Sequence, residues 1–536
     1  MATRDFQLQM LESFSGGLNF RADQFDLADD ESPDLFNVTV DPRGGVQLRN
    51  GVIRRNATAL SADIKGIWGF HTDGGTNRIM VNYGTKVAHS ASGNFTDFTN
   101  ITPRTDGSRV YGITFNNVTY GVSYDKVSFK WDGSTDADLG TTLDGSAGQF
   151  PQAQYVAQWN NHVWVGNTYE GGDTKYRLRW SNLNDAEKWT AADYVDVDKG
   201  EAGDYITGIV PNGDRLVVFK SNSIYAVYGF DTDSFQLVNL TKTVGSIPLS
   251  SPVATPFGVF FWHDRSGVHL LGQNGTAYVF DKLRPAIDDG RITFTNPPQL
   301  AWANEKLYVT VDWTSGGTTT RRTFVYDPSL GKTGAWIMTD IDAGPLFAYQ
   351  PPNTEHLLVG GCVANTGRLI HIDDDDSRVF DKYATNEENI ASHFVTPWIS
   401  TRNPVVKKRW GKPQMVTLAK SSLQMTVEVY KDYDFADYAK TFPVNITGRT
   451  SASVWDTATW QQPSGTNPNT GAALAEGSEG DGVWSSEDQS KVTDVKRLPT
   501  LGTARAISMK IIGPTATNSD WQVNAIGFTY VPRRMR

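Results

Sequence analysis

The sequence contains few residues that are spaced as catalytic groups usually are. Serine hydrolases of the α/β type carry a Gly-x-Ser-x-Gly turn between a strand and a helix, and the chain of 536 residues has no such turn. Gly331-Lys332-Thr333 has the last residues of a phosphate-binding loop, but it lacks the upstream glycine and the following helix. We therefore expect an ordinary turn there, and no enzyme of either class.

Metal-ligating residue types are present, but they do not form a ligand pattern. Only eight His occur, none of them in a His-Glu-x-x-His motif, so His263 and His269 are interpreted as sheet residues. Asp373-Asp374-Asp375-Asp376 is the densest acidic cluster, yet consecutive residues of an extended loop point in opposite directions and should not converge on one Ca²⁺ ion. The same reasoning applies to Asp193, Asp196 and Asp198. We predict neither a metal nor any other cofactor.

Sugar chemistry needs separate consideration. Sialidase-like enzymes hydrolyse glycosides with clustered arginines, a tyrosine nucleophile and carboxylates, whereas Tyr and Arg are scattered along this sequence. The 16 Trp would suit a sugar-binding surface, although Trp in a sheet core is the more common arrangement. Three arginines and two carboxylates that share one pocket would support hydrolysis. A carbohydrate-binding or glycoside-hydrolysing protein thus stays open as the alternative function.

Charge and cysteine content limit the partners and the stabilising groups. The formal net charge of −10 argues against wrapping double-stranded DNA through a general cationic surface. The single cysteine, Cys362, excludes an intramolecular disulfide. No stretch reaches the roughly 18 to 20 apolar residues of a membrane span, and the first residues lack the apolar core of a signal peptide. We therefore expect synthesis in a cytoplasm.

The elements that must position any functional residue are short strands. Aromatic residues make up 12% of the chain, and they stand beside Thr and Val in short runs that Gly, Asn and Asp separate. From about 61 to 380 a unit of strand, turn and strand recurs about seven times, first as Gly66–Phe70 with Arg78–Tyr83. Four strands need about 40 to 50 residues and cannot bury both faces alone. The sequence therefore predicts an all-β protein with a β-propeller of six to eight blades.

The sequence pattern divides the chain into three parts. Residues 1–60 are predicted to form an extended N-terminal arm and residues 61–390 the propeller. Residues 391–536 are predicted to form a β-sandwich-like domain, because Leu423–Tyr430 alternates apolar and polar side chains as a strand with one wet face does. A Gly/Ser/Thr/Asn-rich region near 446–490 is expected to be a long loop inside that domain.

The arm carries the informative motifs. Ser15-Gly16-Gly17-Leu18-Asn19 is followed by the acidic segment Asp29–Val38, which contains Ser32-Pro33-Asp34, and then by Asp41–Gly51, which contains Gly44-Gly45-Val46. Together these segments resemble the opening of the tail nozzle or tail hub proteins of short-tailed bacteriophages, also called tail tubular protein B. The resemblance in motifs covers about residues 14 to 54. Over the propeller only the general strand-and-turn pattern is shared, and residues 391–536 resemble the family only in the kind of domain.

This resemblance implies a structural virion protein located in the tail and made in the bacterial host cytoplasm. The family forms a homo-oligomeric ring of six copies that extends the tail channel, joins an adaptor ring and contacts tail fibres or spikes. Genome DNA is retained and then conducted through the channel without recognition of a specific nucleic-acid sequence. The chain is shorter than the longest nozzle proteins. A tail-tip protein of a long-tailed phage can carry the same N-terminal motifs. If the chain instead binds or hydrolyses carbohydrate, the resemblance implies a receptor-binding component of the tail.

Basic residues are the candidate assembly contacts. The run Lys407-Lys408-Arg409-Trp410 combines cationic and aromatic side chains on an acidic protein, which is typical of a docking surface, although a solvated strand end has the same sequence. Four arginines of the arm are expected to pair with acidic neighbours: Arg43, Arg49, Arg54 and Arg55.

Overall fold

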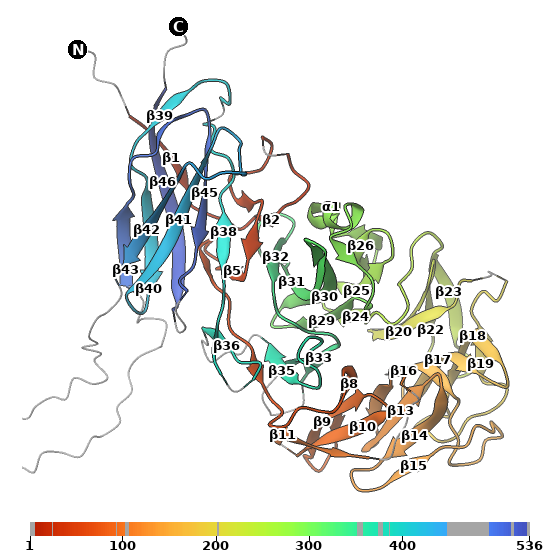
Figure 1. The fold of residues 1–536 in the computed structure, drawn as a ribbon. Coiled ribbons are helices and arrows are strands. Elements are labelled where there is room, and N and C mark those ends of the chain that lie inside the picture. The colour runs from red at the N-terminus through yellow and green to blue at the C-terminus, as the bar shows by residue number, and fades with distance from the viewer. Residues whose placement is uncertain are drawn as a thin grey trace, which may run out of the picture.

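The computed structural model is an all-β protein in which a sandwich and a propeller lie side by side (Figure 1). It describes residues 6–23, 25–92, 94–101, 107–200, 203–350, 357–372, 379–384, 386–401, 403–447, 492–515 and 519–532. Nearly all of the predicted long loop near 446–490 and the cluster Asp373-Asp374-Asp375-Asp376 lie outside these ranges.

Six separate four-stranded sheets are blades in the described part of the chain. Each is an antiparallel meander, as the recurring unit of strand and turn predicted. Five of them consist of strands that follow one another along the chain. The first and second blades are β8 (Ile64–His71), β9 (Asn77–Tyr83), β10 (Lys86–Ala91) and β11 (Asn94–Asn100), and then β12 (Tyr111–Phe115), β13 (Val118–Ser123), β14 (Lys126–Trp131) and β15 (Asp136–Asp138). The third, fourth and fifth blades are β16 (Ala153–Trp159), β17 (His162–Tyr169), β18 (Asp173–Trp180) and β19 (Tyr194–Asp196); β20 (Ile206–Asn212), β21 (Arg215–Lys220), β22 (Ile224–Tyr228) and β23 (Gln236–Thr241); and β24 (Val253–Thr255), β25 (Gly258–His263), β26 (Gly267–Gly272) and β27 (Gly275–Tyr278).

The sixth separate sheet closes the ring with a strand from before it. β33 (Leu346–Tyr349), β34 (Leu357–Gly361) and β35 (Leu369–Ile372) are joined by β7 (Ile53–Arg54), in which Ile53 pairs with His371. A further meander of β29 (Gln299–Ala303), β30 (Lys306–Ser315), β31 (Thr318–Asp327) and β32 (Ala335–Thr339) lies between β24 and β33. The innermost strands β8, β12, β16, β20, β24, β29 and β33 contact one another in that order, and β33 contacts β8.

Paired asparagines form several of the tight turns between blade strands. Asn116 and Asn117 both have positive φ, 48° and 66°, and Asn160 and Asn161 repeat this with 48° and 58°. Two-residue hairpins need positive φ at both central residues, which Asn tolerates better than most side chains do. These dipeptides therefore fix the register of β12 with β13 and of β16 with β17.

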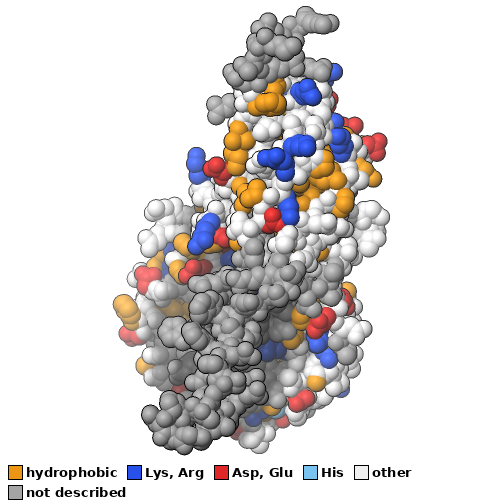
Figure 2. Space-filling view, turned by 90° about the vertical axis from the view of Figure 1, so that its left-hand side faces the viewer, with side chains coloured by type: hydrophobic (Ala, Val, Ile, Leu, Met, Phe, Trp, Pro, Cys, Tyr) orange, Lys and Arg blue, Asp and Glu red, His pale blue; other side chains and the backbone are white. Residues whose placement is uncertain are grey.

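The C-terminal strands form two sheets that face each other. One sheet, here called the outer sheet, has the order β43-β40-β46-β39-β44, and β1 and β6 also pair with β46. The other sheet runs β28-β30-β31-β32-β4-β38-β45-β41-β42, so it contains the β29 to β32 meander. On the side of the molecule that Figure 2 shows, Lys and Arg side chains lie among hydrophobic ones over the sandwich. The bounds are β43 (Val492–Arg497), β40 (Gln414–Ala419), β46 (Trp521–Pro532), β39 (Lys408–Trp410), β44 (Gly502–Ala504), β1 (Gln7–Leu11), β5 (Val38–Val40), β6 (Val46–Leu48), β28 (Ile292–Thr293), β4 (Leu35–Phe36), β38 (His393–Val395), β45 (Ile507–Ile512), β41 (Leu423–Lys431) and β42 (Lys440–Ile446).

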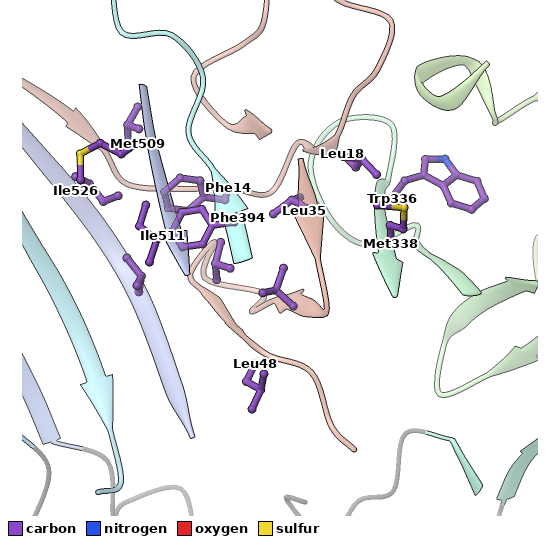
Figure 3. Close-up of a cluster of buried hydrophobic side chains, with 14 of the residues drawn as sticks. Phe14, Leu18, Leu35, Leu48, Trp336, Met338, Phe394, Met509, Ile511 and Ile526 are labelled. Carbon is purple, nitrogen blue, oxygen red and sulfur yellow. The ribbon is translucent and has the colours of Figure 1, made fainter. Parts of the chain in front are cut away.

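The N-terminal segment runs between the sandwich and the propeller. In β4, Phe36 pairs with Met338 of the meander on one side and with His393 of the sandwich on the other. The same core continues across both parts: Phe14 packs 5.2 Å from Phe394, and Figure 3 shows these rings on the sandwich side, with Met338 on the other. The arm is therefore the middle layer of one hydrophobic core.

The remaining described elements are short. β2 (Gly17–Leu18) pairs with β3 (Glu31–Ser32), and β36 (Phe380–Asp381) pairs with β37 (Glu388–Asn389). The helices are a 3-10 turn, η1 (Asp281–Leu283), and α1 (Pro285–Asp288). Among the described residues no helix has the length and apolarity to cross a membrane. The predicted fold class, an all-β propeller with an arm and a sandwich-like domain, is confirmed.

Candidate functional site

The inner strands line an open cavity of about 290 Å³ at the centre of the propeller. Each of the seven innermost strands contributes to its wall, which is mainly aliphatic and aromatic. This volume is near the lower limit for small-molecule sites. One lining residue from each strand, in chain order, is Ile67, Tyr111, Tyr155, Ile209, Val253, Ala301 and Phe347.

Among the described residues that line this cavity, Arg109 supplies the one charged side chain. Its Nη1 donates to the carbonyl oxygen of Leu249 at 3.0 Å and to Oε1 of Gln299 at 2.5 Å, and its Nη2 donates to Oγ of Ser251 at 3.1 Å. The guanidinium also lies over the ring of Tyr111, 4.5 Å from its centroid. These acceptors are neutral, so they orient the cation without cancelling its charge. The cavity can therefore attract a small anion.

Two tyrosines of the cavity are held in the protonated form. Burial raises the pKa of Tyr111, and it raises that of Tyr155 well above the ordinary value of 10. The hydroxyl of Tyr155 accepts a hydrogen bond from the Leu249 amide at 3.2 Å, and the Tyr111 hydroxyl has no partner in the described part of the chain. Both phenols therefore offer O–H groups rather than phenolates at neutral pH.

A second charged cluster lies on the outer strands of the third blade. Arg177 bonds Glu170 at 2.9 Å and Asp196 at 2.7 Å, and Arg179 bonds Glu170 at 2.7 Å. Tyr194 lies under both guanidinium groups, at 3.9 and 4.9 Å from its centroid. The carboxylates and arginines here neutralise one another. Neither this cluster nor the central cavity brings three arginines and two carboxylates together among the described residues.

Arg49 of the arm is buried inside its own chain. Its Nη2 lies 2.5 Å from Asp381 and 2.9 Å from Asp340, and its Nε donates to Oδ1 of Asn37 at 2.9 Å. Burial disfavours the charged form, but the two carboxylates outweigh it and raise the pKa of Arg49. Arg49 thus pairs with acidic residues of its own molecule and connects the arm to two other segments. A side chain that is 3% exposed is not reachable for the predicted assembly contact.

The other arm arginines have different surroundings. Arg43 is exposed in the turn between β5 and β6, where its amide donates to Asp41. Arg54 lies in β7 and pairs with Ile370 through the backbone, and Nη2 of Arg55 lies 2.7 Å from Nδ1 of His371. Two of the four, Arg54 and Arg55, are thus placed at the strand that closes the propeller.

The run Lys407-Lys408-Arg409-Trp410 has two faces, because β39 alternates. Lys408 is buried, and its Nζ donates to three carbonyl oxygens, those of Asn403, Val406 and Arg505, at 2.6 to 3.1 Å. Burial lowers the pKa of Lys408. Trp410 is also buried and donates from Nε1 to the carbonyl of Ala504. Lys407 and Arg409 are exposed, so they are the members of the run that an outside partner can reach.

No group of three or more His, Cys, Asp or Glu side chains suited to a metal ion occurs in the ranges that the structure describes. His263 and His269 lie in the paired strands β25 and β26, and both contact the hydroxyl of Ser266. They are sheet residues, as the sequence indicated.

Sequence reasoning missed Arg109 and the first strand of the chain. Arg109 follows residues without a recognisable motif, and its neighbours Leu249, Ser251 and Gln299 lie far away in the sequence. β1 was included in the extended arm, although Phe6-Gln7-Leu8-Gln9-Met10 alternates apolar and amide side chains and so carries a strand signal.

Solved structures that resemble the chain do so at low sequence identity. A streptogramin B lyase is 10% identical with a TM-score of 0.36, and the match covers 60% of this chain and 97% of that one. Virginiamycin B lyase from Staphylococcus aureus is 11% identical with a TM-score of 0.31, over 69% of this chain and 100% of that one. The β-propeller domain of Cps50 (Swd1) from Myceliophteria thermophila is 13% identical with a TM-score of 0.30, over 63% and 96%. No family model and no curated protein matches the sequence.

Proposed function

We propose that the chain is a structural subunit of a bacteriophage tail, a nozzle or hub ring protein without catalytic activity. The observation that carries the proposal is the course of the N-terminal segment. The residues that resemble the nozzle family, about 14 to 54, form β4 in the middle of the long sheet, β6 on the outer sheet and β7 on the closing blade.

This course suits a protein that has to keep its shape. The arm supplies Phe14, Leu18 and Leu35 to the core that the sandwich and the propeller share, and it adds the buried Arg49. A close-packed hydrophobic core resists deformation, because each side chain fills space left by others. A subunit built in this way can transmit force between its two ends.

The channel of the proposed ring has to lie between subunits. The cavity inside one propeller, at about 290 Å³, accommodates a small molecule and not a nucleic-acid duplex. In this proposal six copies surround the tail axis, bind an adaptor ring on one side and contact fibres or spikes on the other. The DNA then passes along the common axis and makes no sequence-specific contact.

Electron microscopy of purified phage particles tests this proposal. A label fused to the C-terminus should appear in a ring at the tail, in the copy number that the symmetry of that ring requires, and peptides of the chain should be found in the purified particles by mass spectrometry. The absence of the chain from purified particles would contradict the proposal. Turnover of a sialoside or another glycoside by the isolated chain would support the carbohydrate alternative.

A further inference from the structure

We propose that β1 and the outward face of the outer sheet around it bind a second copy of this chain, on the acidic part that carries the propeller. The inference rests on the proposed function, because it assigns one of the surfaces through which copies in a ring would meet. It concerns an exposed edge strand, the side chains beside it and the distribution of charge along the chain.

The first observation is that β1 is an unprotected edge strand. It pairs with β46 from Gln7 opposite Tyr530 to Leu11 opposite Ile526, and in the described part of the chain no strand pairs with its other edge. Edge strands of stable monomers usually carry charged residues, prolines or bulges that prevent further pairing. The six residues Phe6-Gln7-Leu8-Gln9-Met10-Leu11 contain no charge and no proline. The described residues therefore leave the backbone groups of this edge to pair with another chain.

The second observation is the row of apolar side chains on the outward face of β1. Phe6, Leu8 and Met10 are 69%, 62% and 37% exposed, whereas Leu11 is 1% exposed and points into the core. A Cβ added to Gly527 of β46 would lie 2.7 Å from Sδ of Met10 and 3.6 Å from Cδ1 of Leu8. The two side chains thus cover the outward face of β46 and remain open to solvent on their other side.

The third observation is that exposed cations lie on the same face of the outer sheet. Arg409 of β39 is opposite Val531, and Arg497 of β43 is opposite Gln414, which itself is opposite Gly527. Residues that are directly opposite in a sheet share a face, so both arginines point outward with Leu8 and Met10. Arg409 and Arg497 are exposed, and no ion pair to a described residue joins either of them. Figure 2 shows Lys and Arg side chains beside hydrophobic ones on the sandwich.

The charge of the rest of the chain identifies the occupant. Residues 391–536 contain 17 Lys and Arg against 12 Asp and Glu, whereas residues 1–390 contain 32 Lys and Arg against 47 Asp and Glu. Two sandwich faces would repel each other, whereas a sandwich face and the propeller part of a second copy attract. A contact between unlike surfaces is head-to-tail, and head-to-tail contacts close into rings when the rotation allows it. In this contact the apolar side chains of β1 bury surface, and the charges of Arg409 and Arg497 fix how the two copies are positioned against each other.

Sedimentation velocity of the full chain tests the inference. The wild-type protein at up to about 100 μM should form a closed oligomer larger than a dimer, and raising the salt from about 0.05 to about 0.5 M should weaken it. The double variants Leu8→Asp/Met10→Asp and Arg409→Glu/Arg497→Glu should each weaken association at least about tenfold. All four side chains are exposed, so thermal unfolding should remain close to that of the wild type. The matched control is Phe230→Asp, which changes an 86% exposed aromatic residue of the propeller.

Every other outcome contradicts the inference. A wild-type chain that stays monomeric, or double variants that assemble as the Phe230→Asp control does, would show that this face is not the contact. A salt-insensitive dimer that only the Leu8→Asp/Met10→Asp variant abolishes would indicate symmetric pairing of two β1 strands instead. The presence of the chain in phage particles tests the proposed function separately, so the two can fail independently.

Discussion

The guanidinium of Arg49 lies 2.5 Å from the carboxylate of Asp381, a residue 332 positions later in the chain. Both side chains are buried, and Oδ1 of Asp381 also accepts a hydrogen bond from the amide of Val52 at 3.0 Å. The pair therefore connects the segment before the propeller to the segment after it. Since a buried carboxylate is costly without its partner, this contact makes the two ends of the propeller dependent on each other.

Replacing Arg49 should destabilise the protein strongly. Arg49→Met leaves Asp381 buried without a cation, and loss of one partner of a buried pair costs about 3 to 5 kcal/mol. Urea unfolding followed by tryptophan fluorescence measures the change. Arg43→Met, in an exposed turn of the same segment, is the matched control and should alter the free energy of unfolding by less than about 0.5 kcal/mol. Equal effects of the two substitutions would contradict the role given to Arg49.

Lys408 should contribute to stability, although no carboxylate of a described residue pairs with it. Lys408→Met would leave three carbonyl oxygens without their donor, which costs about 1 to 3 kcal/mol. Removal of a buried charge offsets a part of this, so the lower end of the range is expected. The neighbouring exposed Lys407→Met is the control for thermal unfolding. A Lys408→Met protein as stable as the wild type would show that the buried ammonium is not needed.

His269 should make stability depend on pH. Burial, with a smaller effect of His263, lowers the pKa of His269 from 6.5 to about 4. Below pH 6.5 the unfolded chain binds a proton that the folded chain does not bind until about pH 4. The free energy of unfolding therefore decreases as the pH falls from 6.5 to 4, by at most about 3 kcal/mol.

The variant His269→Gln should lose this part of the pH dependence. The measurement is the urea midpoint of wild type and variant at pH 7 and at pH 5, with the difference between the two pH values compared. A variant that loses as much stability as the wild type between these pH values would show that His269 does not titrate as described.

Contact between the first two blades should not tolerate a larger residue at Gly112. A Cβ there would lie 2.4 Å from the ring of Trp68, whose Nε1 donates to Oγ1 of Thr119. Gly112→Ala should therefore destabilise the propeller by about 1 to 3 kcal/mol through overpacking. Gly172→Ala is the control, because nothing lies within 4 Å of its Cβ. Thermal unfolding of both variants distinguishes a packed contact from a general loss of glycine flexibility.

Local pattern was sufficient to predict the blades. The run Arg78–Tyr83 is β9 with one residue added at its start, and the asparagine pairs mark hairpin turns, because strand alternation and positive φ are properties of a few adjacent residues. The fold class followed from the repetition of that unit. The same local reasoning indicated that His263 and His269 are sheet residues.

Long-range pairing was not accessible from the sequence. Nothing in Ile53-Arg54 shows that its partner is Ile370-His371, and nothing near Arg109 points to Leu249 or Gln299. Lys408 and Trp410 were grouped with Lys407 and Arg409 because the four residues are consecutive. Strand alternation instead places the first two on the buried face and the other two on the exposed face. Which of the two faces is buried depends on the position of the second sheet, and a run of four residues does not contain that information.

The pairing of β7 with β35 has a consequence for biosynthesis. Strand Ile53–Arg54 leaves the ribosome early, but Leu369–Ile372 has to be translated before it can dock. Until then the first blade and the last blade made each lack one neighbour, so the nascent polypeptide exposes apolar sheet faces at both ends of the unclosed propeller. Closure of the propeller is thus a late step of folding, and chaperones that shield the growing chain should change the yield of folded protein more than the stability of the finished protein.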